Sequence, residues 1–317
     1  MPQESRSETG RGLWYGFAAY GIWGLFPLYW PLLEPSSATE ILADRMVWSL
    51  VAAVAILAVR RHWAWLRPLL KQPRRLALSA LAAVVIAVNW GVYIWAVNAG
   101  HVVETSLGYF INPLVTIAAG VLLLGERLRR TQWIAVGIGV LAVAVLTLGY
   151  GRLPWIALVL AFSFGSYGLL KKKVALGGLE SFALEAGFLF PFALAYQVYL
   201  ALTGHSTFSH GAGHSALLML TGPITAVPLL CFGAAAIRLP LSTIGLMQYL
   251  APVFQFVIGI AYDHETMAPA NWAGFGLVWV ALLLLSWDAL RRTRPPVAAP
   301  RAAAAERPVE EGVPSGR

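Results

Sequence analysis

Charged residues and cysteine are scarce in this sequence. Charged residues occupy 12% of the 317 positions and apolar residues 58%. A soluble domain usually carries about twice that share of charge. The single cysteine, Cys231, lies in an apolar run, so a disulfide within the chain and a metal cluster built on several cysteines are both excluded. We expect a buried, unreactive thiol at this position.

Several functional signatures are also missing. The chain has no phosphate loop of the form GxxxxGKS or GxxxxGKT, so we do not expect it to drive a pump with ATP. It has no paired acid and base and no nucleophile elbow, so we do not expect an enzyme, and nothing indicates a cofactor. Three histidines share one connector without a carboxylate beside them, so we predict no metal site there. They are His205, His210 and His214.

The net charge of +8 would suggest a nucleic-acid partner if the chain were soluble. Here the Lys and Arg lie in short connectors between apolar runs, which is typical of cytoplasmic membrane loops. We therefore expect a lipid bilayer, and no nucleic acid, as the partner of this chain.

Apolar runs dominate the sequence. Most are about twenty residues long, enough to span the roughly 30 Å hydrocarbon layer of a membrane as a helix. They lie at residues 13–33, 41–59, 76–97, 102–124, 133–148, 153–170, 179–202, 216–237, 241–262 and 272–290. The first is long for a signal peptide and lacks a cleavage site at its end, so we expect it to be retained. The sequence thus predicts an all-α polytopic membrane protein with ten transmembrane helices.

One stretch of the sequence occurs twice. SLGYFINPLVTIAAGVLLLGERL at 106–128 returns 139 residues later as GLMQYLAPVFQFVIGIAYDHETM at 245–267. An internal repeat of this kind indicates two related halves. Because each half holds five helices, an odd number, the second must enter the membrane upside down, as in many secondary transporters. The shift superposes Pro113 on Pro252, Gly120 on Gly259 and Glu126 on Glu265.

The distribution of basic residues predicts the topology. The connectors after the second, fourth, sixth and eighth runs hold most of the Lys and Arg, whereas the opposite connectors hold only Arg152. By the positive-inside rule both termini are cytoplasmic. We divide the chain into an N-terminal tail (1–11), a first repeat (12–149), a second repeat (150–290) and a C-terminal tail (291–317). We expect both tails to be disordered, because their polar or Pro-rich and Ala-rich composition cannot form a core.

Seven strings of the sequence carry a family resemblance. They are ADRMVWSL, NWGVYIWAVN, SLGYFINPL, GERL, LPWIALVLAFSFGSYGLLKK, GPITAVPLL and LSTIGLMQYLAP. In this order, over residues 13–290, they resemble the RarD branch of the EamA family, within the drug/metabolite transporter (DMT) superfamily. The resemblance implies a ten-helix permease of the bacterial inner membrane with two inverted EamA repeats. The family name refers to chloramphenicol sensitivity, and the resemblance leaves the physiological substrate and the oligomeric state open, a homodimer included.

The repeat and the resemblance together predict a secondary permease. We expect it to move small organic metabolites or drug-like solutes by alternating access, with export favoured. A non-transporting membrane sensor or partner-binding subunit is the alternative, and a membrane-embedded transferase is a third. If transport is coupled to protons, Glu104 or Glu185 is the expected carrier.

A proline lies within each copy of the repeated helix. Pro113 lacks an N–H, so the carbonyl of Tyr109 is expected to lose its helical partner. Lipid cannot satisfy that carbonyl, which should therefore face protein or water. Pro252 is expected to do the same to the carbonyl of Gln248.

Polar residues at intervals of four give the fourth and ninth helices one polar stripe each, and the third helix adds an amide and aromatic face. We expect these faces to line a substrate cavity, although small and polar residues also occur where membrane helices simply pack closely. An aromatic lining suits a partly apolar solute. The predicted cavity residues are Tyr109, Asn112, Gln248, Asn89, Tyr93, Glu104 and Gln255.

Residues near the ends of the runs are expected to have structural roles. Trp14, Trp30 and Trp155 are expected to anchor at the membrane interface, where tryptophan is common. Pro223 is expected in a first helical turn, where proline is tolerated. Pro228 lies deeper in its run and is a candidate hinge.

Two ionisable residues lie inside apolar runs, where a charge is costly and usually has a partner or water. Arg45 and Glu185 occupy nearly equivalent places in the two halves, so we expect them to face a shared interior, as a direct pair or across water. Glu40 and Asp44 are nearer to Arg45 in the sequence and are alternative partners. A structural ion pair and a role in substrate binding both stay open at this point.

Overall fold

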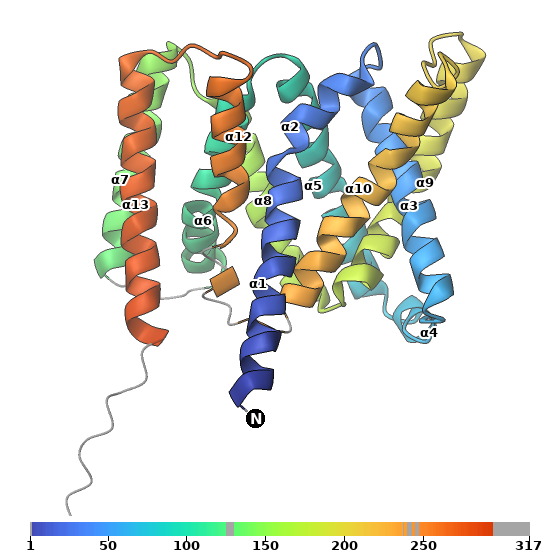
Figure 1. Ribbon diagram of the computed structural model, residues 1–317, viewed down its shortest axis with the longest axis horizontal. Coiled ribbons are helices and arrows are strands. Elements are labelled where there is room, and N and C mark those ends of the chain that lie inside the picture. Colours follow the sequence, from blue (N-terminus) through green and yellow to red (C-terminus); the bar gives the residue numbers. More distant parts are fainter. Residues whose placement is uncertain (1, 125–129, 237, 240–242, 245–246, 294–317) are drawn as a thin grey trace, which may run out of the picture.

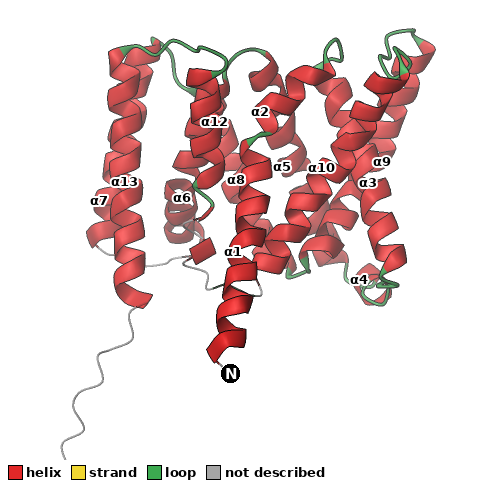
Figure 2. Ribbon diagram, in the orientation of Figure 1, coloured by secondary structure: helices red, strands yellow, loops and turns green. Residues whose placement is uncertain are grey.

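The computed structural model describes residues 2–124, 130–236, 238–239, 243–244 and 247–293 (Figure 1). Over these residues the regular elements are helices, and none of them is a strand (Figure 2). The all-α prediction is therefore confirmed for this part of the chain. Glu126 and most of the predicted C-terminal tail lie outside the described residues.

The helices run side by side in one bundle (Figure 1). They are α1 (Pro2–Gly24), α2 (Phe26–Tyr29), the 3-10 helix η1 (Trp30–Leu33), α3 (Ala38–Val59), α4 (Leu66–Leu70), α5 (Pro73–Asn98), α6 (Val102–Leu124), α7 (Arg130–Tyr150), α8 (Trp155–Val174), α9 (Gly178–Leu202), α10 (Ala212–Ala236), α12 (Leu250–Ala261) and α13 (Pro269–Thr293).

Six of these helices, α3, α5, α7, α9, α10 and α13, are long and apolar enough to cross a membrane. Shorter apolar segments lie in α6, α8 and α12. Large apolar side chains remain exposed on the surface of the bundle, and those of Leu148 and Leu202 are both 83% exposed. Water disfavours such a surface and lipid accepts it. The chain is therefore a multi-pass membrane protein.

The first predicted run is not a single helix, and the tail before it is not disordered. α1 begins at Pro2, and Glu8 in its early turns pairs with Arg11 at 3.0 Å and with Arg238 at 2.9 Å. α1 then ends at Gly24, and α2 and η1 each begin with a proline in the first turn. Proline starts a helix well but cannot continue the hydrogen-bond ladder of the preceding one. The run therefore breaks into three pieces.

The ninth predicted run is also interrupted. α12 begins only at Leu250, after a turn at Gln248 and Tyr249. Pro252 therefore lies in the first turn of α12, where an N–H would have no intrahelical acceptor in any case. Pro252 has no N–H to donate to the Gln248 carbonyl, and that carbonyl lies in the turn before α12 and not within a continuous helix. α6, in contrast, continues across Pro113.

The packing of the helices is regular. In chain order, α1, α3, α5, α6 and α7 can be matched with α8, α9, α10, α12 and α13. The contact of α6 with α8 then corresponds to that of α12 with α1, α5 with α8 to α10 with α1, and α3 with α10 to α9 with α5. The pairs α7 with α13, α6 with α12 and α3 with α9 join matched helices. Exchanging the two sets of helices therefore turns the contacts in each of the first three comparisons into one another and the last three contacts into themselves.

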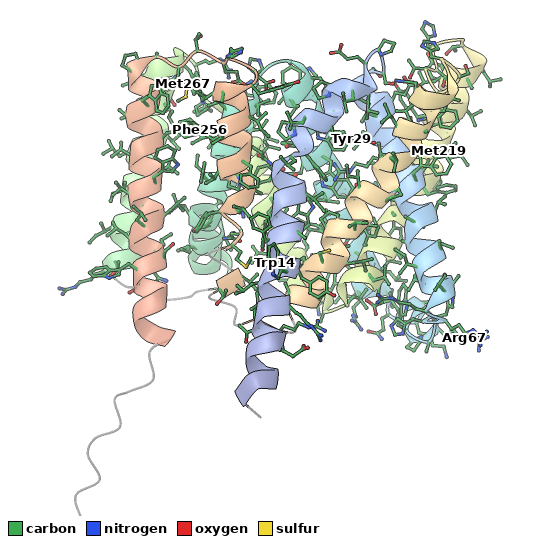
Figure 3. All side chains as sticks on the ribbon, viewed as in Figure 1. Trp14, Tyr29, Arg67, Met219, Phe256 and Met267 are labelled. Carbon is green, nitrogen blue, oxygen red and sulfur yellow. The ribbon has the colours of Figure 1, made fainter. Side chains whose placement is uncertain are left out.

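The two ends of the bundle differ. The N-terminal end of α1, the short helix α4 and the C-terminal end of α13 lie at one end (Figure 1). Arg67 of α4 lies there as well, whereas Tyr29 and Met267 lie toward the opposite end (Figure 3).

Candidate functional site

Arg45 lies about two turns into α3 and is only 2% exposed. Its Nε donates a hydrogen bond to Oγ1 of Thr225 in α10, at 3.0 Å. The guanidinium carbon lies 3.9 Å from the centroid of the Trp90 ring, and 5.2 Å and 5.6 Å from the ring centroids of Trp30 and Phe26. Attraction between the cation and these rings offsets part of the cost of burying the charge.

No carboxylate neutralises Arg45 in the part of the chain that the structure describes. Its Nη1 has no hydrogen-bond acceptor. Glu40 instead accepts a backbone N–H from the loop before α10, at 2.7 Å. Asp44 is buried as well, but it forms no ion pair with Arg45, and its Oδ2 has no hydrogen-bond partner among the described residues, because adjacent residues of a helix point in different directions. A direct pair between Arg45 and Glu185 is not formed.

Two tyrosines and an amide lie beside the arginine. Asn89 and Tyr93 are four residues apart on α5 and so share one face. The rings of Tyr93 and Tyr109 pack edge to face with centroids 5.8 Å apart, and the Tyr109 hydroxyl donates to Oδ1 of Asn89 at 3.3 Å. Both rings pack in the same buried cluster as Phe26 and Trp30, which contact Arg45. The structure therefore brings together three of the predicted cavity residues, and the Tyr93 hydroxyl among them has no partner.

Glu185 of α9 is buried and fully partnered. It pairs with Lys171 of α8 at 3.0 Å. It also accepts from the hydroxyl of Tyr167 at 2.8 Å and from that of Ser181 at 2.8 Å. Its charge is therefore neutralised within the protein, without Arg45.

Trp90 connects the surroundings of the two charges. One ring face lies against Arg45, and the same side chain lines a small cavity together with Ser49 and Glu185. The cavity measures about 10 Å³, which is close to the room that one water molecule needs. The Ser49 hydroxyl is buried without a partner, so water in this cavity would have a polar group to bind.

A larger cavity, of about 500 Å³, lies near the C-terminal end of α3. Its lining includes Arg60, His62 and Glu180, and the last two are joined at 2.8 Å between Nε2 and Oε1. Arg60 and His62 lie between α3 and α4 in the chain, so this cavity lies at the end of the bundle that holds α4.

Three predicted cavity residues lie elsewhere. Glu104 pairs with Arg152 at 2.7 Å and accepts the backbone N–H of Ile156 at 3.2 Å, which joins the starts of α6 and α8. Gln255 donates to the carbonyl of Trp23 at 3.2 Å and joins α12 to α1. Gln248 lies in the turn before α12 and is half-buried. No hydrogen bond or ion pair joins these three to Arg45, Thr225 or the two tyrosines among the described residues.

Asn112 follows Tyr109 by about one turn of α6. It is half-buried, and its Oδ1 has no hydrogen-bond partner among the described residues. A Cβ added at Gly165 of α8 would lie 3.4 Å from this oxygen. The glycine therefore lets α8 approach the amide closely. Pro113 follows directly and leaves α6 helical.

α10 carries both of its prolines in its interior. It begins at Ala212, so Pro223 is not in a first turn, and that prediction is wrong. Pro223 and Pro228 therefore each remove one bond from the helical ladder. Thr225 lies between them and is the residue that accepts from Arg45. The proline pair in TGPITAVP was the sequence signal that could have pointed to it.

Two further residues of the site were not predicted. Trp30 was expected at the membrane interface, but its ring is 0% exposed and its Nε1 has no acceptor. The break after α1 turns η1, and Trp30 with it, toward Arg45. Lys171 was counted with a cytoplasmic connector, but α8 extends past it to Val174. Trp14 and Trp155, in contrast, are exposed, and their anchoring at the membrane interface stays a prediction.

Local caps determine where two helices of the site begin. The Ser37 hydroxyl accepts the N–H of Glu40 at 3.2 Å and starts α3. Glu265, in the loop after α12, accepts the N–H groups of Val102 and Val103 at 2.5 Å and 3.2 Å and caps α6. Burial of the Glu265 carboxyl raises its pKa to about 7.

The helices and the buried polar cluster define a multi-pass membrane protein with a polar interior. Residues 10–148 match the EamA-like transporter family. The chain is 64% identical over 293 residues to Protein RarD of Streptomyces exfoliatus, which covers 92% of this chain and 93% of that protein. The chain therefore belongs to the EamA-like transporter family, on its RarD branch, and is a membrane permease of the DMT type.

Two other comparisons extend this result. The Chloramphenicol-sensitive protein RarD of Pseudomonas aeruginosa is 32% identical over 294 residues, which covers 90% of this chain and 97% of that protein. A protein of known crystal structure superposes with a TM-score of 0.58 at 17% identity, over 88% of this chain and 99% of its own. At that identity the superposition shows a shared fold alone.

Proposed function

We propose that this permease is a secondary transporter for small organic solutes, built from two inverted five-helix halves that alternate access to a central site. The observation that carries the proposal is the Arg45 cluster. It is buried where helices of both halves meet, and it holds polar groups with no partner in the protein. Packing alone gives no reason to keep such groups in a membrane interior.

The matched helix contacts support the inverted halves. Contacts that recur after an exchange of the two sets of helices are expected from a twofold axis between 12–149 and 150–290. The repeat at 106–128 and 245–267 lies in α6 and around α12, which pack against each other. Five spans in each half make the orientation opposite.

The basic end of the bundle supports a cytoplasmic location for both termini. The N-terminus, α4 with Arg67 and the end of α13 share that end (Figure 3), as the positive-inside rule requires. The 500 Å³ cavity lies at the same end. It would admit solute from the cytoplasm, which is the first step of export.

Movement between the inward-open and outward-open states would bend the bundle where the helical hydrogen bonds are already interrupted. α10 contains two interior prolines and contacts both α3 and α1. The turn before α12 is a second interruption. If protons are coupled, Glu185 is better placed than Glu104, because it borders the small cavity near Arg45.

Water access to the interior tests the proposal. A cysteine is introduced at Asn112 in a Cys231→Ala background, and its reaction with small charged thiol reagents is followed in membranes. We expect modification from at least one side, whereas a matched cysteine at Val140, which is exposed midway along the candidate membrane span α7, should stay unmodified. Protection of the Asn112 position from both sides would contradict the proposal. Proteoliposomes with and without the protein, compared for accumulated solutes under a proton gradient, would then identify what moves.

A further inference from the structure

We propose that Arg45 binds the carboxylate of the transported solute, and that the substrates are monocarboxylates with an apolar or aromatic body. The proposal rests on the transport function proposed above and adds a substrate class to it.

The first argument is charge. A guanidinium is always protonated in proteins, and a buried charge needs a counter-charge or strong hydrogen bonds. Arg45 is 2% exposed, yet it has one hydrogen bond to a neutral hydroxyl and three ring contacts. Glu40 accepts a backbone N–H and Glu185 pairs with Lys171. Asp44 forms no ion pair with Arg45 in the described structure, and its Oδ2 has no hydrogen-bond partner there. The adjoining cavity of about 10 Å³ has room for about one water molecule. A negative group from outside the protein would therefore complete the site once the helices separate during the transport cycle.

The second argument is the type of atom left unpaired. Nη1 of Arg45, Nε1 of Trp30 and the hydroxyl of Tyr93 are all buried without a partner. The first two can only donate, and a phenol donates readily. A ligand that satisfies all three must supply acceptors. A carboxylate has two oxygens with about four acceptor positions, and it matches the fork of a guanidinium in two parallel bonds.

The third argument is the size of the charge and the nature of the walls. One guanidinium neutralises one negative charge, so a doubly charged phosphate would leave a net charge buried at high cost. The rings of Phe26, Trp30 and Trp90 surround the cation. Rings of this kind pack against an apolar or aromatic body, which favours a hydrophobic monocarboxylate over a small hydrophilic one.

Binding to the purified protein in nanodiscs tests this directly. Benzoate, hexanoate and indole-3-acetate are each compared by calorimetry with the neutral amide of the same shape: benzamide, hexanamide and indole-3-acetamide. We expect at least one acid to bind about tenfold or more tightly than its amide. Arg45→Gln should abolish that preference, and Arg45→Lys should retain part of it. Arg67→Gln, which removes an exposed arginine of α4, should leave it unchanged.

A second variant covers the case in which Arg45→Gln does not fold. Trp30→Phe keeps the aromatic ring and removes only the Nε1 donor, so acid binding should weaken about fivefold while amide binding stays the same. The proposal is overturned if none of the three acids binds more tightly than its amide to the wild-type protein. It is also overturned if folded Arg45→Gln still binds the acid more tightly than the amide, because the preference would then not depend on Arg45.

The failure of this proposal and that of the transport function are distinguishable. Arg45-dependent binding of an acid without its movement across proteoliposomes would reject transport and keep the carboxylate site. Movement of solutes that ignores both their charge and Arg45 would reject the carboxylate site and keep transport.

Discussion

Arg45 and Glu185 occupy nearly equivalent places in the two halves, and both are buried, yet their surroundings differ. Glu185 has a cation and two hydroxyls as partners. Arg45 has one hydroxyl and three aromatic rings, and no carboxylate pairs with it in the described part of the chain. A buried charge that the protein neutralises serves the fold. One that the protein leaves with free donors is suited to a ligand.

The local sequence accounts for this difference. Tyr167 and Lys171 are four residues apart on α8, so both point to the same side of that helix, where Glu185 of α9 meets them. The neighbours of Arg45 instead contribute Trp30 from η1 and Trp90 from α5. An aromatic wall tolerates a cation without neutralising it.

The largest expected effect comes from reversing the charge at Arg45. Arg45→Glu places an unpartnered carboxylate against aromatic rings, at a cost of roughly 3–5 kcal/mol or more. We expect little folded protein by size-exclusion chromatography. Arg45→Met, which removes the charge instead of reversing it, should be tolerated far better.

The double variant Arg45→Glu with Glu185→Arg sharpens this test. Because the two residues do not pair directly, the swap should recover nothing and should also break the contact of Glu185 with Lys171. Recovery of folded protein by the swap would mean that the two charges interact directly. Arg45 could then not be described as the charge that lacks a partner within the protein.

The next largest effect is expected at Glu185. Glu185→Gln leaves the Lys171 ammonium without its counter-charge, and the side chain of that lysine is only 24% exposed. We expect a loss of roughly 2 kcal/mol, below the value for a fully buried pair because Lys171 still reaches some solvent. Thermal unfolding in detergent measures it. Adding Lys171→Met to Glu185→Gln should restore part of the loss, whereas Lys173→Met, on an exposed lysine, should change nothing. Equal losses in the single and double variants would count against pairing.

A smaller effect is expected from Thr225→Val, which removes the only hydrogen-bond acceptor that Arg45 has in the described structure. A hydrogen bond to a charged group is worth about 1.5–3 kcal/mol, and water from the nearby cavity can replace part of it. We therefore expect a loss of about 1 kcal/mol in the free energy of unfolding. Thr225→Ser keeps the hydroxyl and should behave as wild type. A neutral Thr225→Val would mean that the rings alone hold Arg45.

Much of this contrast could be anticipated from the sequence. The spacing of Asn89 and Tyr93 on one helix face predicted their side of the cluster, and the intramembrane positions of Arg45 and Glu185 marked them as functional or paired. The all-helical fold followed from the run lengths. The orientation of each half, and the assignment of these residues to a substrate cavity, stay predictions.

Partners were harder to anticipate because hydropathy does not report hydrogen bonds. Lys171 lies in the last, polar turn of α8. A prediction from the lengths of apolar runs ends the helix before it, although α8 continues to Val174. Trp30 is buried because η1 breaks from α1, and the break depends on the prolines after Gly24. The turn before Leu250 could not be predicted from hydropathy either, because it lies within an apolar run.

A third carboxylate, that of Glu265, distinguishes the effect of burial from the effect of an ion pair. Glu265 is half-buried, whereas Glu185 is buried. Glu265 accepts the backbone N–H groups of Val102 and Val103, and within the described residues no lysine or arginine pairs with it. Desolvation raises its pKa from 4.5 to about 7 despite those bonds, and the charges of Asp263 and Glu104 act in the same direction. Glu185, with Lys171 beside it, is the paired case.

The pH dependence of stability distinguishes the two cases. Because the folded pKa of Glu265 lies above its unfolded value, the stabilisation by its proton is complete below pH 4.5 and is lost as the pH rises through 7. The melting temperature in nanodiscs should therefore decrease as the pH is raised from about 5 to about 8, a range that covers most of the interval between the unfolded and folded pKa values. Glu265→Gln should flatten that slope, whereas Glu34→Gln, on an exposed loop residue, should not. Parallel slopes for wild type and Glu265→Gln would mean that the amides of α6 satisfy this carboxylate as fully as Lys171 satisfies Glu185.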